Sequence, residues 1–144
     1  MASSRSRDLH ILPLAITPLL LILLSSPHAA SGAPNTTPLS VLCNRAVYGE
    51  GDPFAASLAY VLSDLLAATP SSRAREAYSI SPYPNSFAYG HAACRGGVPA
   101  NAGDCASCLG SAVGKMNATC GHAVGARAVL VDCRVRYEQY AFVD

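Results

Sequence analysis

The chain has 144 residues and six cysteines, and its 10 basic and 9 acidic residues give a formal net charge of +1. Such a balanced chain has no cationic field to attract the phosphates of nucleic acids or an anionic bilayer. Nucleic acid is therefore not an expected partner, and the length suits a single domain.

Residues 1–33 have the layout of a secretory signal peptide. Arg5 and Arg7 precede an apolar run from Ile11 to Leu24, and the small residues AASGA follow. The run contains two prolines and rises only about 21 Å as a helix, less than the roughly 30 Å hydrocarbon core of a bilayer. We therefore predict a leader over 1–33 and one mature domain over 34–144, the alternative being a retained signal anchor. The predicted mature chain has eight basic and eight acidic residues.

The mature chain carries two sequons for N-linked glycosylation. They begin at Asn35 (NTT) and at Asn117 (NAT). Because a glycan requires an exposed asparagine, we expect both candidate glycosylation sites at the surface.

The first part of the mature chain predicts a strand followed by an amphipathic helix. Leu39 to Cys43 is short and apolar and indicates a first strand. Asp52 is the expected N-cap, with Pro53 at the first helical position, and apolar residues then recur at helical spacing to about Thr69. Pro70 is expected to end this helix, whose apolar face predicts a role in the core.

Two short strands and a second helix are predicted next. The strands run from Tyr78 to Ser81 and from Phe87 to Ala93, on either side of a Pro-Tyr-Pro-Asn turn. Asp104 is the expected N-cap of the second helix and Gly121 its stop. Apolar residues and three cysteines share one face of this helix, which should face the core: Cys105, Cys108, Leu109, Ala112, Val113, Met116 and Cys120.

The segment from Gly125 to Phe142 predicts the last two strands. Ala126 to Val131 and Val135 to Phe142 are rich in β-branched and aromatic residues. The resulting order of strand, helix, two strands, helix and two strands predicts an α+β domain with two helices on one face of an antiparallel sheet. We expect no segment of the mature chain to be apolar and long enough to span a membrane.

An even number of cysteines behind a predicted leader indicates three disulfides. Fifteen connectivities are possible. Cys105 and Cys108 share a helical turn and should pair elsewhere, whereas Cys94 and Cys105 flank a short glycine-rich loop that a local bridge would close.

The alternative to disulfides is a metal site, because Cys105 and Cys108 form a CxxC and the chain also contains His91 and His122. One CxxC without a second pair is a weak zinc signal, so we expect no metal and no cofactor.

The cysteine spacing and the last segment resemble a known plant domain. The pattern Cys94-x10-Cys105-x2-Cys108, followed by Cys120 and by GARAVLVDC and RYEQYAF, is similar to the ginkbilobin-like cysteine-rich antifungal domain. This domain also occurs in cysteine-rich receptor-like kinases and plasmodesmata-located proteins. The loop between the second and third cysteines is two residues longer here than is usual in the family, which changes the loop-closure entropy little. The resemblance implies two helices on a five-stranded antiparallel sheet and the disulfides Cys43–Cys120, Cys94–Cys105 and Cys108–Cys133.

The same resemblance implies a mannose site. The family's binding residues are an asparagine after the first cysteine, the arginine of GAR and the glutamate of YEQ, which correspond to Asn44, Arg127 and Glu138. Amide, guanidinium and carboxylate groups suit the hydroxyls of a neutral sugar. Arg127 and Glu138 are roughly 36 Å apart along one straight strand, so they can share a sugar only if the chain reverses near Asp132 and Cys133. The alternative is a cross-strand ion pair between Arg127 and Glu138, with Asn44 closing a turn.

These features predict a secreted, mannose-binding antifungal protein of the extracellular space, or apoplast, whose partner is mannose or mannose-bearing fungal cell-wall glycans. The alternative is an apoplastic interaction or signalling module, without sugar binding, that engages a plant cell-surface protein. No catalytic function is predicted, because the cysteines should be oxidised and no nucleophile–base set or paired carboxylates are apparent in the sequence.

Overall fold

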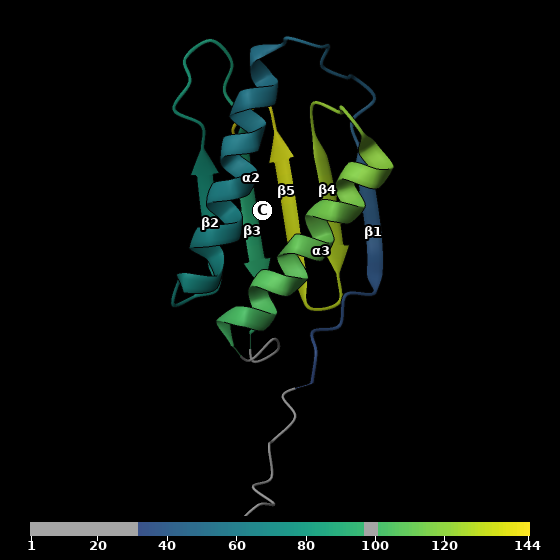
Figure 1. Cartoon of the computed structure of the whole chain (residues 1–144), viewed down its shortest axis with the longest axis vertical. Helices are drawn as coiled ribbons and strands as arrows, with labels where there is room; N and C mark the ends of the chain where they lie inside the picture. Colours follow the sequence, from purple (N-terminus) through teal and green to yellow (C-terminus); the bar gives the residue numbers. More distant parts are fainter. Residues whose placement is uncertain (1–31, 97–100) are drawn as a thin grey trace, which may run out of the picture. The chain divides into compact units, whose positions relative to one another are not determined.

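The computed structural model describes residues 32–96 and 101–144. These residues form two helices and one five-stranded antiparallel sheet with the strand order β1-β4-β5-β3-β2. Helix α2 lies over β2 and β3, and helix α3 crosses β1, β4 and β5 on the same face of the sheet (Figure 1). This confirms the predicted α+β fold. In chain order the elements are β1 (Pro38–Cys43), α2 (Pro53–Ser71), β2 (Glu76–Ile80), β3 (Tyr89–Cys94), α3 (Ala102–Cys120), β4 (Ala126–Leu130) and β5 (Cys133–Glu138).

Two predictions fall on residues outside those described. The predicted leader, 1–33, coincides almost wholly with residues 1–31, and part of the long loop between the second and third cysteines falls on residues 97–100. The leader and its cleavage region therefore stay predictions.

The strands begin and end differently from the prediction at several points. β2 starts at Glu76, because Glu76 and Ala77 pair with the last residues of β3. β5 starts at Cys133 itself, which pairs with Cys94, so the reversal between β4 and β5 occupies positions 131 and 132. β5 ends at Glu138 rather than Phe142. Residues 139–144 leave the sheet and fold back along the face that the helices do not cover, where Asp144 bonds to Arg136.

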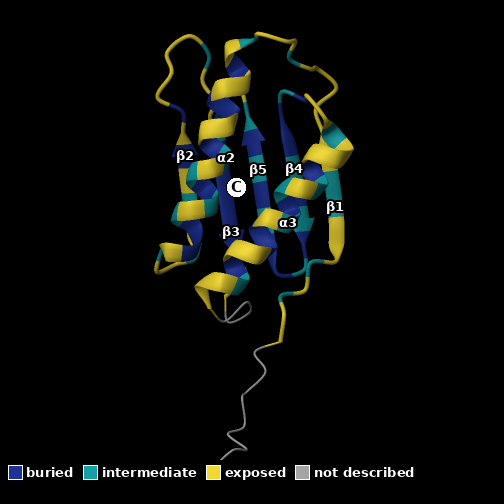
Figure 2. Cartoon of the chain, viewed as in Figure 1, coloured by how far each residue is buried: buried dark blue, intermediate teal, exposed yellow. Residues whose placement is uncertain are grey.

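The core lies between the helices and the inner face of the sheet. Alternating strand residues point to opposite faces, and on β4 and β5 the buried set turns towards the helices. In Figure 2 the buried positions gather on the central strands and on the helix faces turned towards them. The largest fully buried side chains contributed by the helices include Phe54, Val61 and Leu65 from α2 and Leu109 and Met116 from α3.

Helix α2 begins as predicted but ends later. The Asp52 carboxylate accepts a hydrogen bond from the Phe54 N–H at 2.9 Å, and Pro53 occupies the first turn. Pro70 was predicted to end the helix, yet the helix continues through it to Ser71. A proline this close to the end removes one hydrogen bond without breaking a long following segment, and the Ser72 N–H closes the last turn on the carbonyls of Ala68 and Thr69.

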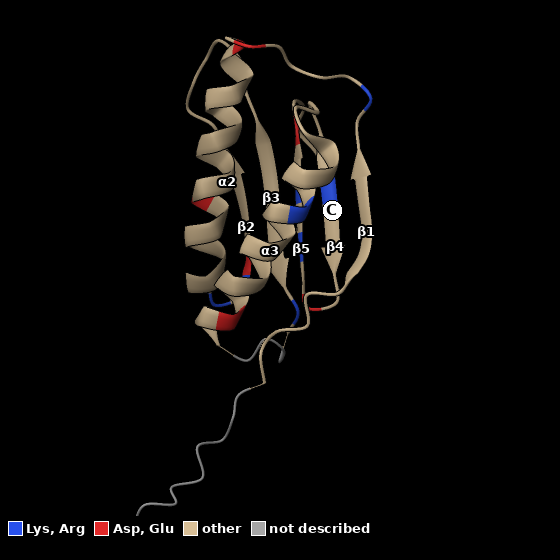
Figure 3. Cartoon of the chain, turned by 45° about the vertical axis from the view of Figure 1, so that its right-hand side comes forward, with Lys and Arg blue, Asp and Glu red and all other residues tan. Residues whose placement is uncertain are grey.

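The expectation that no mature segment could span a membrane by length and composition was wrong for α2. This helix has 19 residues and a mean hydropathy of 1.2, and Asp64 is the one charged residue in its sequence. In Figure 3 the ribbon of α2 is accordingly almost entirely tan. Its apolar face, however, packs against the sheet through residues such as Phe54 and Val61, which are fully buried. The hydrophobicity of α2 is thus that of a core helix.

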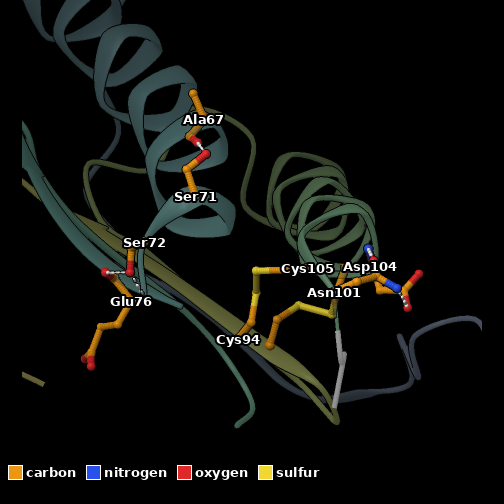
Figure 4. Close-up of a disulfide and its surroundings, with 10 residues drawn as sticks. Ala67, Ser71, Ser72, Glu76, Cys94, Asn101, Asp104 and Cys105 are labelled. Atoms are coloured by element: carbon orange, nitrogen blue, oxygen red, sulfur yellow. Dashed lines mark hydrogen bonds between the residues drawn. A yellow bond between two sulfur atoms is a disulfide. The ribbon is translucent and has the colours of Figure 1, made fainter. Parts of the chain in front are cut away.

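Helix α3 is capped by Asn101, not by the predicted Asp104. The Asn101 side-chain oxygen accepts the Asp104 N–H at 2.8 Å, and the Asp104 carboxylate accepts the Asn101 side-chain amide at 2.9 Å (Figure 4). Asp104 therefore occupies the third helical position and completes a reciprocal cap, where its charge also favours the helix N-terminus. The helix stops as predicted at Gly121, which has a φ of +53°.

All three disulfides implied by the resemblance are present. Cys43–Cys120 joins the end of β1 to the end of α3, and Cys108–Cys133 joins α3 to the start of β5. Cys94–Cys105 joins the end of β3 to the first turn of α3 (Figure 4). Their Cα–Cα distances are 5.3, 6.0 and 5.7 Å in that order. Because both cysteines of the CxxC are oxidised, neither offers a thiolate to a metal.

Candidate functional site

A hollow of about 310 Å³ opens where the N-terminal end of β4 meets the C-terminal ends of β1 and β5. It brings the three predicted sugar-binding residues together. Arg127 and Glu138 project from the sheet face opposite the helices, since their neighbours Ala126 and Tyr137 point into the core. The hollow is lined by Leu42, Cys43, Asn44, Gly125, Ala126, Arg127, Arg136 and Glu138.

The reversal that a shared ligand requires is present, but the two charged residues are not directly opposite. β4 and β5 form a hairpin in which Arg127 pairs with Arg136, and Glu138 lies two residues further along β5. Diagonal neighbours of this kind remain within reach of long side chains. Arg127 and Glu138 therefore contribute to the same hollow from different strands.

The cross-strand ion pair between Arg127 and Glu138 does not form. Glu138 Oε1 instead accepts a hydrogen bond from Arg136 Nε at 3.2 Å. Within the described residues Arg127 takes part in no ion pair, and its buried Nε has no hydrogen-bond partner. A buried donor without an acceptor is costly, so Arg127 Nε is a group that an oxygen of a ligand would satisfy.

Asn44 closes a turn and also borders the hollow. Its backbone N–H donates to the Gly125 carbonyl at 2.8 Å, and its side-chain oxygen accepts the Ala46 N–H at 3.0 Å. The preceding residue, Cys43, is bonded to Cys120, which ties this end of β1 to α3. With the oxygen engaged in the turn, the side-chain NH₂ group is the part of Asn44 suited to a ligand.

Gly125 sets the position of the Glu138 carboxylate. A Cβ built on Gly125 would overlap Glu138 Oε2 and lie 2.9 Å from Glu138 Cδ. The absence of a side chain at this buried position therefore leaves room for the carboxylate at the edge of the hollow. The sequence signal was the glycine that begins the GAR motif, two residues before Arg127.

Arg136 is a site residue that sequence reasoning missed. Besides its bond to Glu138, it donates from Nη1 to Asp144 Oδ1 at 2.7 Å, and its guanidinium lies 4.1 Å from the centroid of the Phe142 ring. The available signal was its spacing of two from Glu138, which places both side chains on one face of a strand. Arg136 thus connects the hollow to the C-terminal segment.

A buried histidine lies beyond Arg136 under the same segment. His91 is fully buried, with Nδ1 2.9 Å from Asp144 Oδ2, Nε2 2.7 Å from Glu76 Oε1, and its ring stacked on Tyr78. Burial would raise the pKa of the Asp144 carboxyl, but hydrogen bonds from Arg136 and His91 outweigh burial and lower that pKa below its ordinary value. These contacts hold residues 142–144 against the sheet.

Replacing Asp144 with asparagine is expected to lower the free energy of unfolding at neutral pH by about 1.5–3 kcal/mol, the range for hydrogen bonds to charged groups. Because the Asp144 pKa is lower in the folded than in the unfolded protein, its stabilisation is complete above the ordinary aspartate pKa of about 4 and is lost as pH falls through the folded value. The difference between variant and wild type should therefore shrink below about pH 4.

Urea unfolding of both proteins across this pH range measures the difference. Glu50→Gln, at an exposed loop position without an ion pair in the described structure, is the control for a general loss of negative charge. A constant difference between Asp144→Asn and wild type at every pH would contradict the assignment.

Comparison with known proteins identifies the family. A family model described as salt stress response/antifungal matches residues 42–140. The chain belongs to this family. The antifungal protein ginkbilobin-2 of Ginkgo biloba is 33% identical over 150 residues, which cover 99% of this chain and 100% of that protein. The antifungal protein ginkbilobin-like protein 1 of Picea glauca is 35% identical over 121 residues, which cover 78% of this chain and 79% of that protein.

The salt stress response/antifungal fold also occurs in solved receptor-like ectodomains. The tandem DUF26 ectodomain of the Arabidopsis thaliana cysteine-rich receptor-like protein PDLP5 superposes with a TM-score of 0.66 at 23% identity, over 74% of this chain and 52% of that one. For PDLP8 the TM-score is 0.57 at 28% identity, over 73% and 46%. This chain therefore spans about half of each tandem ectodomain.

Proposed function

We propose that this member of the family is a secreted, non-catalytic antifungal protein that binds mannose or mannose-bearing fungal cell-wall glycans. The observation that carries the proposal is the gathering of Asn44, Arg127 and Glu138 around one hollow, with no acceptor in the described protein for Arg127 Nε. Membership of an antifungal family and two relatives named as antifungal proteins support the biological role.

The available hydrogen-bonding groups suit the hydroxyls of a sugar ring. Arg127 and the Asn44 NH₂ group supply donors, and Glu138 Oε2 supplies an acceptor. The hollow, at about 310 Å³, is at the small end of the range for ligand pockets. A site of this size with three polar residues should bind one monosaccharide weakly, so useful avidity for a cell wall depends on several sites acting together.

The same groups do not favour glycoside hydrolysis. That reaction ordinarily uses two carboxyl groups on either side of the scissile bond. Glu138 is the single carboxylate among the residues that line this hollow, and one of its oxygens is bonded to Arg136. We therefore assign a binding role to the hollow.

Calorimetry with D-mannose tests the proposed site. Wild type should bind, and Arg127→Ala and Glu138→Ala should each weaken binding about tenfold or more, because each removes a charged hydrogen-bonding partner. Gly125→Ala should also weaken binding, since the added methyl group displaces the Glu138 carboxylate. Arg134→Ala is the matched control: Arg134 lies on the same face of β5 but outside the hollow.

Absence of binding by the wild type would refute the mannose site, and wild-type affinity in both alanine variants would move the site elsewhere. A fungal growth assay with the same proteins links binding to killing. Growth inhibition should fall in the variants that lose mannose and persist in Arg134→Ala.

The likeness to the PDLP5 and PDLP8 ectodomains favours a second candidate, an extracellular protein-interaction module without sugar binding. A protein that keeps its antifungal activity in Arg127→Ala and Glu138→Ala would support this second candidate over the first.

A further inference from the structure

We infer that the hollow selects an acidic sugar, a hexuronate, and that Arg127 binds its carboxylate. This inference rests on the sugar-binding function proposed above and adds the chemical class of the preferred ligand. Three observations carry it: the balance of charge in the hollow, the balance of donors and acceptors, and the unpaired state of Arg127.

The hollow carries one surplus positive charge. Its charged lining residues are Arg127, Arg136 and Glu138. Glu138 is paired with Arg136, which also binds Asp144 from outside the lining. Arg127 therefore remains the cation without a carboxylate partner in the described part of the chain. A neutral ligand would leave Arg127 without a direct carboxylate partner, whereas a carboxylate on the ligand would supply one.

Donors also outnumber acceptors around the hollow. The Arg127 guanidinium offers a planar fork of N–H groups, and the Asn44 side-chain oxygen is occupied by Ala46, which leaves the NH₂ group as a further donor. On the acceptor side, Glu138 Oε1 is engaged by Arg136 and Oε2 remains. A ligand with more acceptors than donors matches this set, and a carboxylate adds two acceptor oxygens in the geometry that an arginine fork prefers.

The state of Arg127 separates a binding role from a structural one. An arginine with a structural role on a sheet face is expected to pair with a nearby carboxylate, as Arg136 does with Glu138 on its own strand and with Asp144 in the C-terminal segment. Arg127 instead lies in register with Arg136, a like charge, and its Nε has no acceptor among the residues that the structure describes. An anionic group on the ligand would supply the acceptor that the buried Arg127 Nε lacks.

A comparison of D-mannose with D-mannuronate tests the inference, because the two sugars differ only in a hydroxymethyl group replaced by a carboxylate. By calorimetry at neutral pH and low ionic strength, mannuronate should bind about tenfold more tightly than mannose, as a charge-assisted pair is stronger than a neutral hydrogen bond. Added salt should narrow this difference, because it screens the ion pair.

Three variants assign the effect to Arg127. Arg127→Gln should abolish the preference for mannuronate, and Arg127→Lys should retain part of it, because lysine keeps the charge but not the fork. Arg134→Gln, which removes a cation from the same sheet face outside the hollow, should leave the preference intact. Thermal unfolding should show Arg127→Gln at least as stable as wild type, since the change removes the buried Nε that has no acceptor in the described structure.

Each outcome decides a separate point. Equal affinity for both sugars would overturn the acidic-sugar inference while leaving mannose binding in place, and failure of both to bind would overturn the two proposals together. Binding of mannuronate alone would support the inference and replace mannose as the ligand. Displacement of mannuronate by acetate at equal concentration would show a simple anion site and would also overturn the inference.

Discussion

Replacing Cys43 and Cys120 together with serine is expected to cause the largest loss of stability of any change considered for this protein. The bridge spans a sequence separation of 77 residues, against 11 for Cys94–Cys105. Loop-closure entropy then gives a loss of about 4.5 kcal/mol for the long bridge and about 2.8 kcal/mol for the short one. Denaturant unfolding of the two double variants measures both values.

The same two double variants test whether the Cys43–Cys120 disulfide positions the residues of the hollow. Cys43 precedes Asn44 and lines the hollow. Cys94 pairs with Cys133 at the start of β5, at the other end of that strand from Glu138, and neither Cys94 nor Cys105 lines the hollow. Mannose affinity should therefore fall further in Cys43→Ser/Cys120→Ser than in Cys94→Ser/Cys105→Ser. Equal losses of stability and of affinity in the two double variants would show that neither loop length nor proximity to Asn44 matters.

Replacing Gly90 with alanine is expected to lower the free energy of unfolding by about 1–3 kcal/mol, the cost of overpacking a close-packed core. Gly90 is buried on β3 directly beneath α2. An added Cβ would overlap Val61 Cγ1 and lie 2.8 Å from Leu65 Cδ1. Val61 has little freedom to move, because it is β-branched and fully buried, so α2 must shift away from the sheet.

Gly110→Ala is the matched control for Gly90→Ala. Gly110 lies in α3, is exposed, and has open space where a Cβ would be placed. Alanine at a helical position of this kind should stabilise the protein by about 0.5–1 kcal/mol through helix propensity. Opposite signs for the two glycine variants in denaturant unfolding would support the packing argument. A neutral or stabilising Gly90→Ala would show that α2 is not held closely to β3 at this point.

Residues adjacent in the sequence predicted most of the helices and strands. The wrong predictions concern helix and strand ends that depend on residues close in space but distant in the sequence. The cap at Asp52 followed from residues adjacent in sequence and is confirmed. The helix end predicted at Pro70 and the helix start predicted at Asp104 were wrong by one to three positions. A helix end depends on which backbone or side-chain groups complete its terminal hydrogen bonds. β2 begins at Glu76, although the sequence around it is polar, because β3 offers a partner there.

The site shows the same division. Asn44, Arg127 and Glu138 were named from sequence resemblance, and the need for a reversal near Asp132 followed from strand geometry alone. The register of β4 against β5 was not predictable from spacing, because a shift of a residue or two in the turn changes which residues face each other. That register places Arg136 opposite Arg127 and leaves Glu138 to pair along its own strand.

The sequence by itself determined the α+β class, because apolar periodicity and capping residues are local properties, and its resemblance to a known family supplied the residues of the candidate site. The tertiary structure alone decided that Arg127 has no ion-pair partner among residues 32–96 and 101–144, because such partners depend on the strand register and on a C-terminal segment that returns to Arg136. The preference proposed for an acidic sugar therefore follows from the folded arrangement, since a pair between Arg127 and Glu138 would leave Arg127 with a protein carboxylate in the place proposed for the ligand's carboxylate.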